Sequence, residues 1–174
     1  PEEEKKDDAK GEKTEAPAKV ESKREARKLT NLGAGFRSNP VWSPDSKMIA
    51  YTDQNGRLFL TTVESGETKE IDKDPWMNQI AVSWSSDSQW MTYSRADDKN
   101  NLGCIVITNA KTGEKHQVTS AMFNSTAPTF DRKGEWLFFA SNRAIDNPRY
   151  AEIENSFAYT DTAVMLMVPL RNDI

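Results

Sequence analysis

The chain has 174 residues and a formal net charge of -4, and 36% of its residues are hydrophobic. This mildly acidic charge gives no support to nucleic acid as a partner, since nucleic-acid-binding domains usually carry clustered basic residues. No apolar run reaches the roughly 20 residues that span a bilayer as a helix, and the single cysteine excludes an internal disulfide.

Residues 1–27 differ in composition from the rest of the chain. They are dominated by Glu, Lys and Asp, and they contain one Val and no aromatic residue. Such a segment buries too little apolar surface to offset the entropy of ordering, so we expect a disordered, charged linker or tail. A role as an interaction tail is the alternative.

One sequence pattern then occurs three times. The copies are NPVWSPDSKMIAYT at 39–52, AVSWSSDSQWMTYS at 81–94 and APTFDRKGEWLFFA at 127–140. The aromatic residues that head them, Trp42, Trp84 and Phe130, are 42 and 46 residues apart. Self-similarity at this period is typical of repeat architectures, β-propellers among them.

Each copy predicts two strands joined by a tight turn. The turn residues are Pro44-Asp45-Ser46, Ser86-Asp87-Ser88 and Arg132-Lys133-Gly134. Pro presets φ, Asp and Ser bond back to the backbone, and Gly accepts a positive φ. Further strands are predicted at 58–63 and 68–71, at 104–109 and 116–119, and at 163–170. Four short strands in 42 to 46 residues correspond to one blade of a propeller.

The predicted fold class is therefore all-β. We expect a partial β-propeller of about three four-stranded antiparallel blades over 28–174, at about 28–72, 73–119 and 120–174. Residues 28–30 are interpreted as the outer strand of a preceding blade, because Leu29 lies 13 residues before Trp42, as Ile71 lies 13 before Trp84. Three blades do not close a ring, and each outer face would expose an apolar sheet. We expect a segment of a longer polypeptide, or a fold that pairs these faces between chains.

The repeats also carry a family resemblance. WSPDSKMIAYTD and WSSDSQWMTYS resemble the WSPDG-type repeats of the periplasmic TolB protein and related β-propellers. Together with KLTNLGAGFRSNPVWSPDSKMIAYTDQNGRLFL, TFDRKGEWLFFASNR and NPRYAEIENSFAYTD, they are similar to the second, seven-bladed propeller of tricorn-type proteases and their bacterial homologues. The aromatic and acidic insertion at 147–161 is the distinctive part, because generic propellers lack it.

The resemblance implies a non-catalytic role, which is to guide or gate peptide substrates to a separate catalytic domain of a tricorn-like serine protease. The implied partners are peptides or unfolded polypeptide, the remaining blades and catalytic domains of a parent chain, and further copies in a homo-oligomer. It implies no cofactor, and it implies a cytoplasmic location with the periplasm as the alternative. A TolB-like interaction propeller with no attached enzyme is the second hypothesis, and the propeller of a prolyl-oligopeptidase-type enzyme is the third.

The residues themselves predict no catalytic or metal site. A Ser or Cys nucleophile needs a base beside it, and the only histidine, His116, is predicted on an outer strand. One His and one Cys cannot make a closed zinc site, and Cys104 leads an apolar run that indicates a buried, small hydrophobic residue. Asp45 and Asp87 recur with the turn, which favours a role in the turn over metal binding.

Candidate recognition residues lie just before the first strand of each blade, where propellers of this type open at one mouth of the channel. The candidates for channel or peptide contact are Phe36, Arg37, Asn39, Met77, Asn78, Phe123 and Asn124. Packing between blades is the alternative for the apolar ones. In the insertion, expected to be a loop, Tyr150, Phe157 and Tyr159 are candidate interface anchors, with capping of the blade as the alternative.

Overall fold

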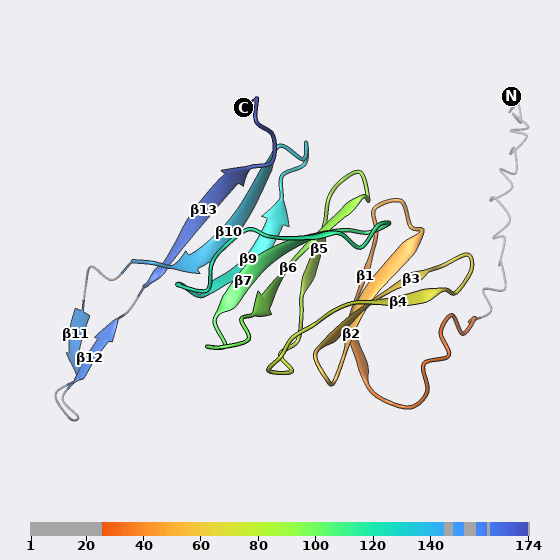
Figure 1. Cartoon of the computed structure of the whole chain (residues 1–174), viewed down its shortest axis with the longest axis horizontal. Coiled ribbons are helices and arrows are strands. Elements are labelled where there is room, and N and C mark those ends of the chain that lie inside the picture. The colour runs from red at the N-terminus through yellow and green to blue at the C-terminus, as the bar shows by residue number, and fades with distance from the viewer. Residues whose placement is uncertain (1–25, 145–147, 152–155, 160, 174) are drawn as a thin grey trace, which may run out of the picture.

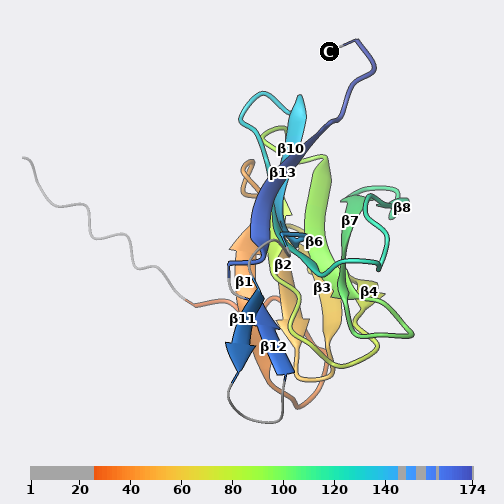
Figure 2. The same ribbon diagram turned by 90° about the vertical axis from the view of Figure 1, so that its left-hand side faces the viewer.

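The computed structural model describes residues 26–144, 148–151, 156–159 and 161–173, and within these ranges every regular element is a β-strand. The strands form three antiparallel sheets side by side in one row (Figure 1). Seen along the row, the sheets stand one behind another (Figure 2). The predicted all-β, partial propeller is confirmed. The predicted charged tail falls almost entirely outside the described residues.

The first two sheets have the same topology. The first contains β1 (Arg37–Trp42), β2 (Met48–Asp53), β3 (Arg57–Thr62) and β4 (Thr68–Lys73), paired in sequential order. The second contains β5 (Val82–Trp84), β6 (Trp90–Ala96), β7 (Gly103–Asn109) and β8 (Lys115–Gln117), again in sequential order. Each sheet is therefore one blade, and its first strand ends at the repeated tryptophan.

The third sheet has three strands and an insertion. It contains β9 (Ser125–Phe130), β10 (Trp136–Asn142) and β13 (Ala163–Pro169), with β10 in the middle. Between β10 and β13, the strands β11 (Pro148–Ala151) and β12 (Ser156–Tyr159) pair as a hairpin that projects beyond the sheet (Figure 1). The segment expected to be a loop thus contains two strands.

The repeated turn is built by hydrogen bonds from its own side chains. The hydroxyl of Ser43 donates to Asp45 Oδ1 over 2.6 Å and accepts from the N–H of Met48 over 2.9 Å. This bond from Ser43 lowers the pKa of Asp45, which stays ionised as an acceptor. The second turn repeats the arrangement with Ser85 and Asp87. The sequence prediction that these aspartates form turns is confirmed.

Two apolar layers hold the sheets together. The layer between the first and second sheets contains Ala50, Leu58, Leu60, Ile71, Ile80, Met91, Tyr93, Val106 and Ala110. The layer between the second and third contains Ile105, Leu137 and Phe139, with Ile107, Val118, Phe130, Leu166, Val168 and Leu170 partly buried around them. Since alternate strand residues point to opposite faces, Val106 faces one neighbour and Ile105 the other. A blade in this row is buried on both faces.

The prediction of a strand at 28–30 is wrong, although these residues do cover a sheet. They have no regular structure, because no strand among the described residues lies beside them to form a ladder. Leu29 and Thr30 instead line a small pocket with Ile49 and Tyr51 on the outer face of the first sheet. Leu29 thus lies against the outer face of the first sheet. Ile71 lies in the layer between the first and second sheets, and Val118 lies in the layer between the second and third.

Candidate functional site

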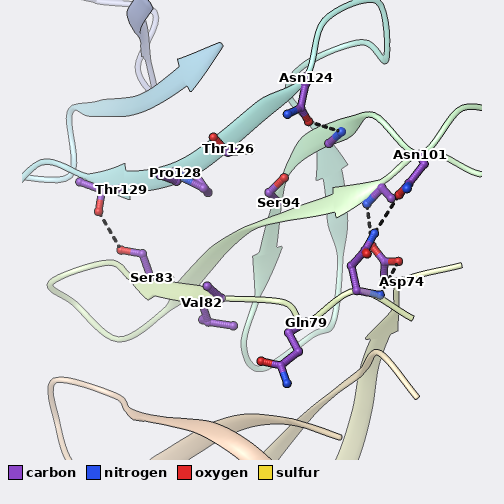
Figure 3. Close-up of a pocket in the computed structure, with 15 residues that line it drawn as sticks. Asp74, Gln79, Val82, Ser83, Ser94, Asn101, Asn124, Thr126, Pro128 and Thr129 are labelled. Carbon is purple, nitrogen blue, oxygen red and sulfur yellow. Dashed lines mark hydrogen bonds between the residues drawn. The ribbon is translucent and has the colours of Figure 1, made fainter. Parts of the chain in front are cut away.

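A groove of about 610 Å³ runs between the second and third sheets, along their first strands (Figure 3). Its walls come from β5, from β9 and from the linker that joins the first sheet to the second. The hydroxyls of Ser83 on β5 and Thr129 on β9 form a hydrogen bond of 3.3 Å across the groove. The volume falls in the range of small-molecule and cofactor sites, about 300–1,000 Å³.

The β9 wall of the groove is shaped by a bulge. The register between β9 and β10 shifts between Thr126 and Thr129, and Ala127 has a φ of 51°. The equivalent residue of the first sheet, Asn39, has a φ of 52° at a similar shift between β1 and β2. Bulges of this kind redirect side chains at functional edges, and here they turn short side chains and backbone toward the groove.

The described residues that line the groove expose no charged side chain. Its one lining residue with a charge is Asp74, which is 1% exposed. Asp74 Oδ1 accepts from the N–H groups of Trp76 and Asn78 over 2.9 and 3.0 Å, and Oδ2 accepts from the N–H of Ala96 over 2.8 Å. Because the buried carboxylate accepts three backbone N–H groups and fixes the linker to β6, we assign it a structural role.

Side-chain amides form the polar part of the groove. Asn78 donates through Nδ2 to Asn101 Oδ1 over 2.8 Å, and the N–H of Gly103 donates to Asn124 Oδ1 over 2.8 Å. The Oδ1 of Asn78 and the Nδ2 of Asn124 have no protein partner among the described residues. Asn78 therefore leaves one acceptor, and Asn124 one donor, without a partner among the described residues, as Figure 3 shows for Asn124.

The structure places only some of the predicted contact residues at this groove. Asn78 and Asn124 line it. Asn39 reaches its rim, where its Nδ2 donates to Gln79 Oε1 over 3.1 Å. Gln79 and Asn101 also line the groove and were not among the predicted contacts. The sequence signal that could have indicated Asn101 is the polar link at 95–103, which is longer than the corresponding link at 53–57 of the first repeat.

The other predicted contacts lie outside the groove lining. Phe36 is 82% exposed and Met77 is 62% exposed. Arg37 donates to the carbonyls of Phe36 and Leu32, so its guanidinium orders the segment before β1. Phe123 is partly covered by the guanidinium of Arg143, which lies 4.9 Å from the ring centroid.

The predicted interface residues belong to the hairpin. Tyr150 pairs with Phe157, and Tyr159 pairs with Pro148, across β11 and β12. Their side chains lie outside what the structure describes, so their role as interface anchors stays a prediction.

The titratable groups of the described residues form no catalytic arrangement. His116 is exposed on β8, and its Nε2 lies 3.2 Å from Glu114 Oε1, with no nucleophile bonded to it. Cys104 is 3% exposed, and burial, with the nearby Asp97, raises the pKa of its thiol. This confirms Cys104 as a buried residue, with little thiolate at neutral pH. Within the described ranges, no three His, Cys, Asp or Glu residues are grouped to hold a metal.

Comparison with known proteins identifies relatives of this chain. The family described as "Tricorn protease second beta propeller domain" matches residues 6–174. The tricorn protease of Thermoplasma volcanium is 29% identical over 150 residues, covering 83% of this chain and 14% of that protein. Tricorn protease homolog 1 of Streptomyces coelicolor is 27% identical over 145 residues, covering 83% and 13%. The chain therefore spans about one seventh of the length of these relatives.

Solved structures show the same fold. The crystal structure of the tricorn protease superposes with a TM-score of 0.70 at 18% identity, covering 80% of this chain and 14% of that chain. TolB from Acinetobacter baumannii superposes with a TM-score of 0.50 at 21% identity, covering 72% and 32%. At these identities the likeness concerns the fold alone. Among the described residues, none form a helix of the length and apolarity that crossing a membrane requires.

Proposed function

Because this chain belongs to the tricorn protease second β-propeller family, we propose that it guides or gates peptides on their way to a separate catalytic domain. The observation that carries the proposal is the groove between the second and third sheets. It is neutral, it offers the free amide groups of Asn78 and Asn124, and it runs along the first strands. Amide groups match the donors and acceptors of a peptide backbone, which every sequence shares. Such a groove suits passage of many peptides better than selection of one.

The proposal also concerns the longer protein to which this chain would belong. We propose that residues 28–174 contribute three blades, at about 28–72, 73–119 and 120–174, to a larger ring in a longer serine peptidase that also supplies the catalytic residues. The two tricorn relatives support this, since each is several times longer than this chain. The hairpin residues Tyr150, Phe157 and Tyr159 are the proposed contacts to a catalytic domain or to another copy in a homo-oligomer. The proposed compartment is the cytoplasm, with the periplasm as the alternative.

The test uses the full-length gene product and two classes of substrate. A double variant, Asn78→Ala with Asn124→Ala, removes the two amide groups from the groove. For a long, unstructured peptide we expect KM to rise about threefold to tenfold at constant kcat, as the loss of one or two neutral hydrogen bonds implies. For a short chromogenic peptide that needs no channel, neither constant should change. Asn55→Ala, in the exposed β2–β3 turn, is the matched control.

Two results would overturn the proposal. One is an unchanged KM for the long peptide in the double variant. The other is peptidase activity of the 174-residue chain alone, which would place the catalytic groups within it.

A TolB-like interaction propeller without an attached enzyme is the second candidate, supported by the fold it shares with TolB. Under that function the full-length gene product has no peptidase activity, and the groove contacts a folded protein partner. Reading the gene beyond codon 174 separates the two candidates directly.

A further inference from the structure

A second groove lies between the second and third sheets, at the ends where β5 turns into β6 and β9 turns into β10. It measures about 480 Å³. Trp90, Phe130, Ile107 and Leu170 supply apolar surface, and all four are only partly buried. Asp87, His116 and Lys133 are the lining residues with ionisable side chains. The proposed passage of peptides along the first strands does not use this groove.

The turns beside this groove differ at one position from those at the junction of the first and second sheets, where Met48, Leu60 and Lys69, the counterparts of Trp90, Ile107 and His116, line a smaller groove of about 230 Å³. Ser46, Ser88 and Gly134 hold the same place in the three turns, with φ of 60°, 60° and 73°. Between the first and second sheets, Ser88 Oγ accepts the N–H of Asp45 over 3.0 Å and links the two turns. Gly134 has no side chain to do this between the second and third sheets. A Cβ built on Gly134 meets no atom within 4 Å, so the space is open.

The missing hydroxyl leaves a backbone donor at the groove. Asp87 is the counterpart of Asp45, 42 residues further on. Its N–H has no acceptor among the described residues, whereas that of Asp45 is bonded to Ser88. Asp87 is exposed, so water can accept this N–H in the free chain. At the junction between the first two sheets, a hydroxyl oxygen takes the equivalent position.

We propose that this groove binds a peptide segment from a partner protein, with a carbonyl oxygen accepting the N–H of Asp87 and an adjacent apolar side chain packed on Trp90 and Phe130. The bonded junction supplies the first requirement, because an oxygen fills the equivalent position there. The aromatic walls supply the second, because Trp and Phe surfaces gain most from covering by an aromatic or branched side chain. The volume accommodates one such residue with its flanking backbone.

The proposal does not depend on peptide passage along the first strands, because the two grooves share no lining residue. It adds a docking site for an apolar residue within an extended segment. Specificity would come from the size and shape of that side chain, while the hydrogen bond to Asp87 fixes the backbone.

The test measures binding of N-acetyl-4-fluorophenylalanine methylamide to the 174-residue chain by fluorine NMR. The probe has one aromatic ring and two carbonyl oxygens. Gly134→Ser restores the serine that the other two turns carry at the same φ, so its hydroxyl can occupy the acceptor position. We expect line broadening with the unchanged chain and at least a tenfold weaker Kd with Gly134→Ser.

Two variants serve as controls. Gly113→Ser makes the same substitution at a φ of 75° where an added Cβ also meets nothing within 4 Å, but in the β7–β8 turn away from the groove lining. It should bind the probe as the unchanged chain does. The Asn78→Ala, Asn124→Ala double variant, which alters the other groove, should also bind normally. Equal binding by Gly134→Ser and the unchanged chain, no binding by the unchanged chain, or loss of binding in the double variant would each overturn the proposal.

Discussion

The first and second sheets are copies of one sequence pattern, yet equivalent residues have different surroundings in them. Trp42 and Trp84 lie 42 residues apart at the ends of β1 and β5. Trp84 packs against the apolar layer between the two sheets, whereas Trp42 is 52% exposed. Both tryptophans lie on the same face of their blades. Among the described residues, only the second blade has another sheet packed against this face.

Two more pairs with the same spacing follow this rule. Tyr93 is buried and its hydroxyl donates to Asp72 Oδ2 of the first sheet over 2.7 Å, while Tyr51 bonds only to Thr61 within its own sheet. Ser88 accepts a hydrogen bond from the first sheet, while its equivalent Ser46 is exposed. Each copy of the pattern therefore carries the residues that contact a neighbouring sheet. Those contacts form only where such a sheet is present.

The largest effect is expected at Asp74, which the second sheet has and the first lacks. Asp74→Ala leaves three N–H groups of the linker and β6 without their acceptor. Since each unsatisfied donor costs about 1–3 kcal/mol, partly relieved by relaxation, we expect a loss of roughly 4 kcal/mol in the free energy of unfolding. Urea denaturation of the 174-residue chain measures it.

Leu32, 42 residues before Asp74, is the control position. It is 41% exposed in the segment ahead of β1, so Leu32→Ala should cost no more than about 0.5 kcal/mol. Equal losses for the two substitutions would show that Asp74 does not anchor the second sheet.

Much of the blade could be predicted from the sequence, because its determinants are local. An aromatic residue, a Ser-Asp turn and a second apolar run lie within 14 residues, and the turn closes through side chains such as Ser43 and Asp45. Strand order followed, since short turns permit only neighbouring antiparallel strands. Asn78 and Asn124, two of the predicted contact residues, line the polar groove, and their contact with peptide stays a prediction.

What the sequence could not supply depends on partners distant along the chain. Residues 28–30 match the pattern of an outer strand but have no strand beside them. The role of Asp74 requires the N–H of Ala96, 22 residues away along the chain. Gly134 fits a tight turn as well as a serine does. Only the three-dimensional alignment of the turns shows that Gly134 leaves the N–H of Asp87 without the acceptor that Ser88 supplies to Asp45.

The next largest difference in the free energy of unfolding is expected between Trp84→Ala and Trp42→Ala. Trp84→Ala removes a half-buried indole from the apolar layer, and we expect a loss of about 3 kcal/mol, at the lower end for tryptophan truncation. Trp42→Ala should cost about 1 kcal/mol in the 174-residue chain, because half of its surface is already in water.

The same pair also tests the proposed ring. In the full-length gene product a further blade would cover Trp42, and the loss for Trp42→Ala should then approach that for Trp84→Ala. Equal losses in the 174-residue chain itself would contradict the contrast between the two faces.

The tyrosine pair is expected to differ by a smaller amount. Burial and the neighbouring Asp72 carboxylate raise the pKa of Tyr93 well above its usual value, so its hydroxyl stays a donor at every working pH. Tyr93→Phe removes a hydrogen bond to a charged group and should cost about 2 kcal/mol. Tyr51→Phe removes a neutral bond to Thr61 at 3.2 Å and should cost about 1 kcal/mol. A larger loss for Tyr51→Phe would mean that the contact to Asp72 adds nothing to the junction.

The smallest effect concerns the single hydroxyl that distinguishes the two junctions. Ser88→Ala removes the acceptor for the N–H of Asp45 without changing the backbone requirement for a positive φ. We expect a loss of about 1 kcal/mol in thermal or urea unfolding, against no measurable change for Ser46→Ala, which is exposed at the same place in the first turn. Because Gly134 lacks this hydroxyl, the measurement also estimates how strongly an oxygen is held at that position. If the two alanine variants proved equally stable, the bond between Ser88 and Asp45 would not hold the turns together, and an oxygen at the equivalent position beside Gly134 would add no stability either.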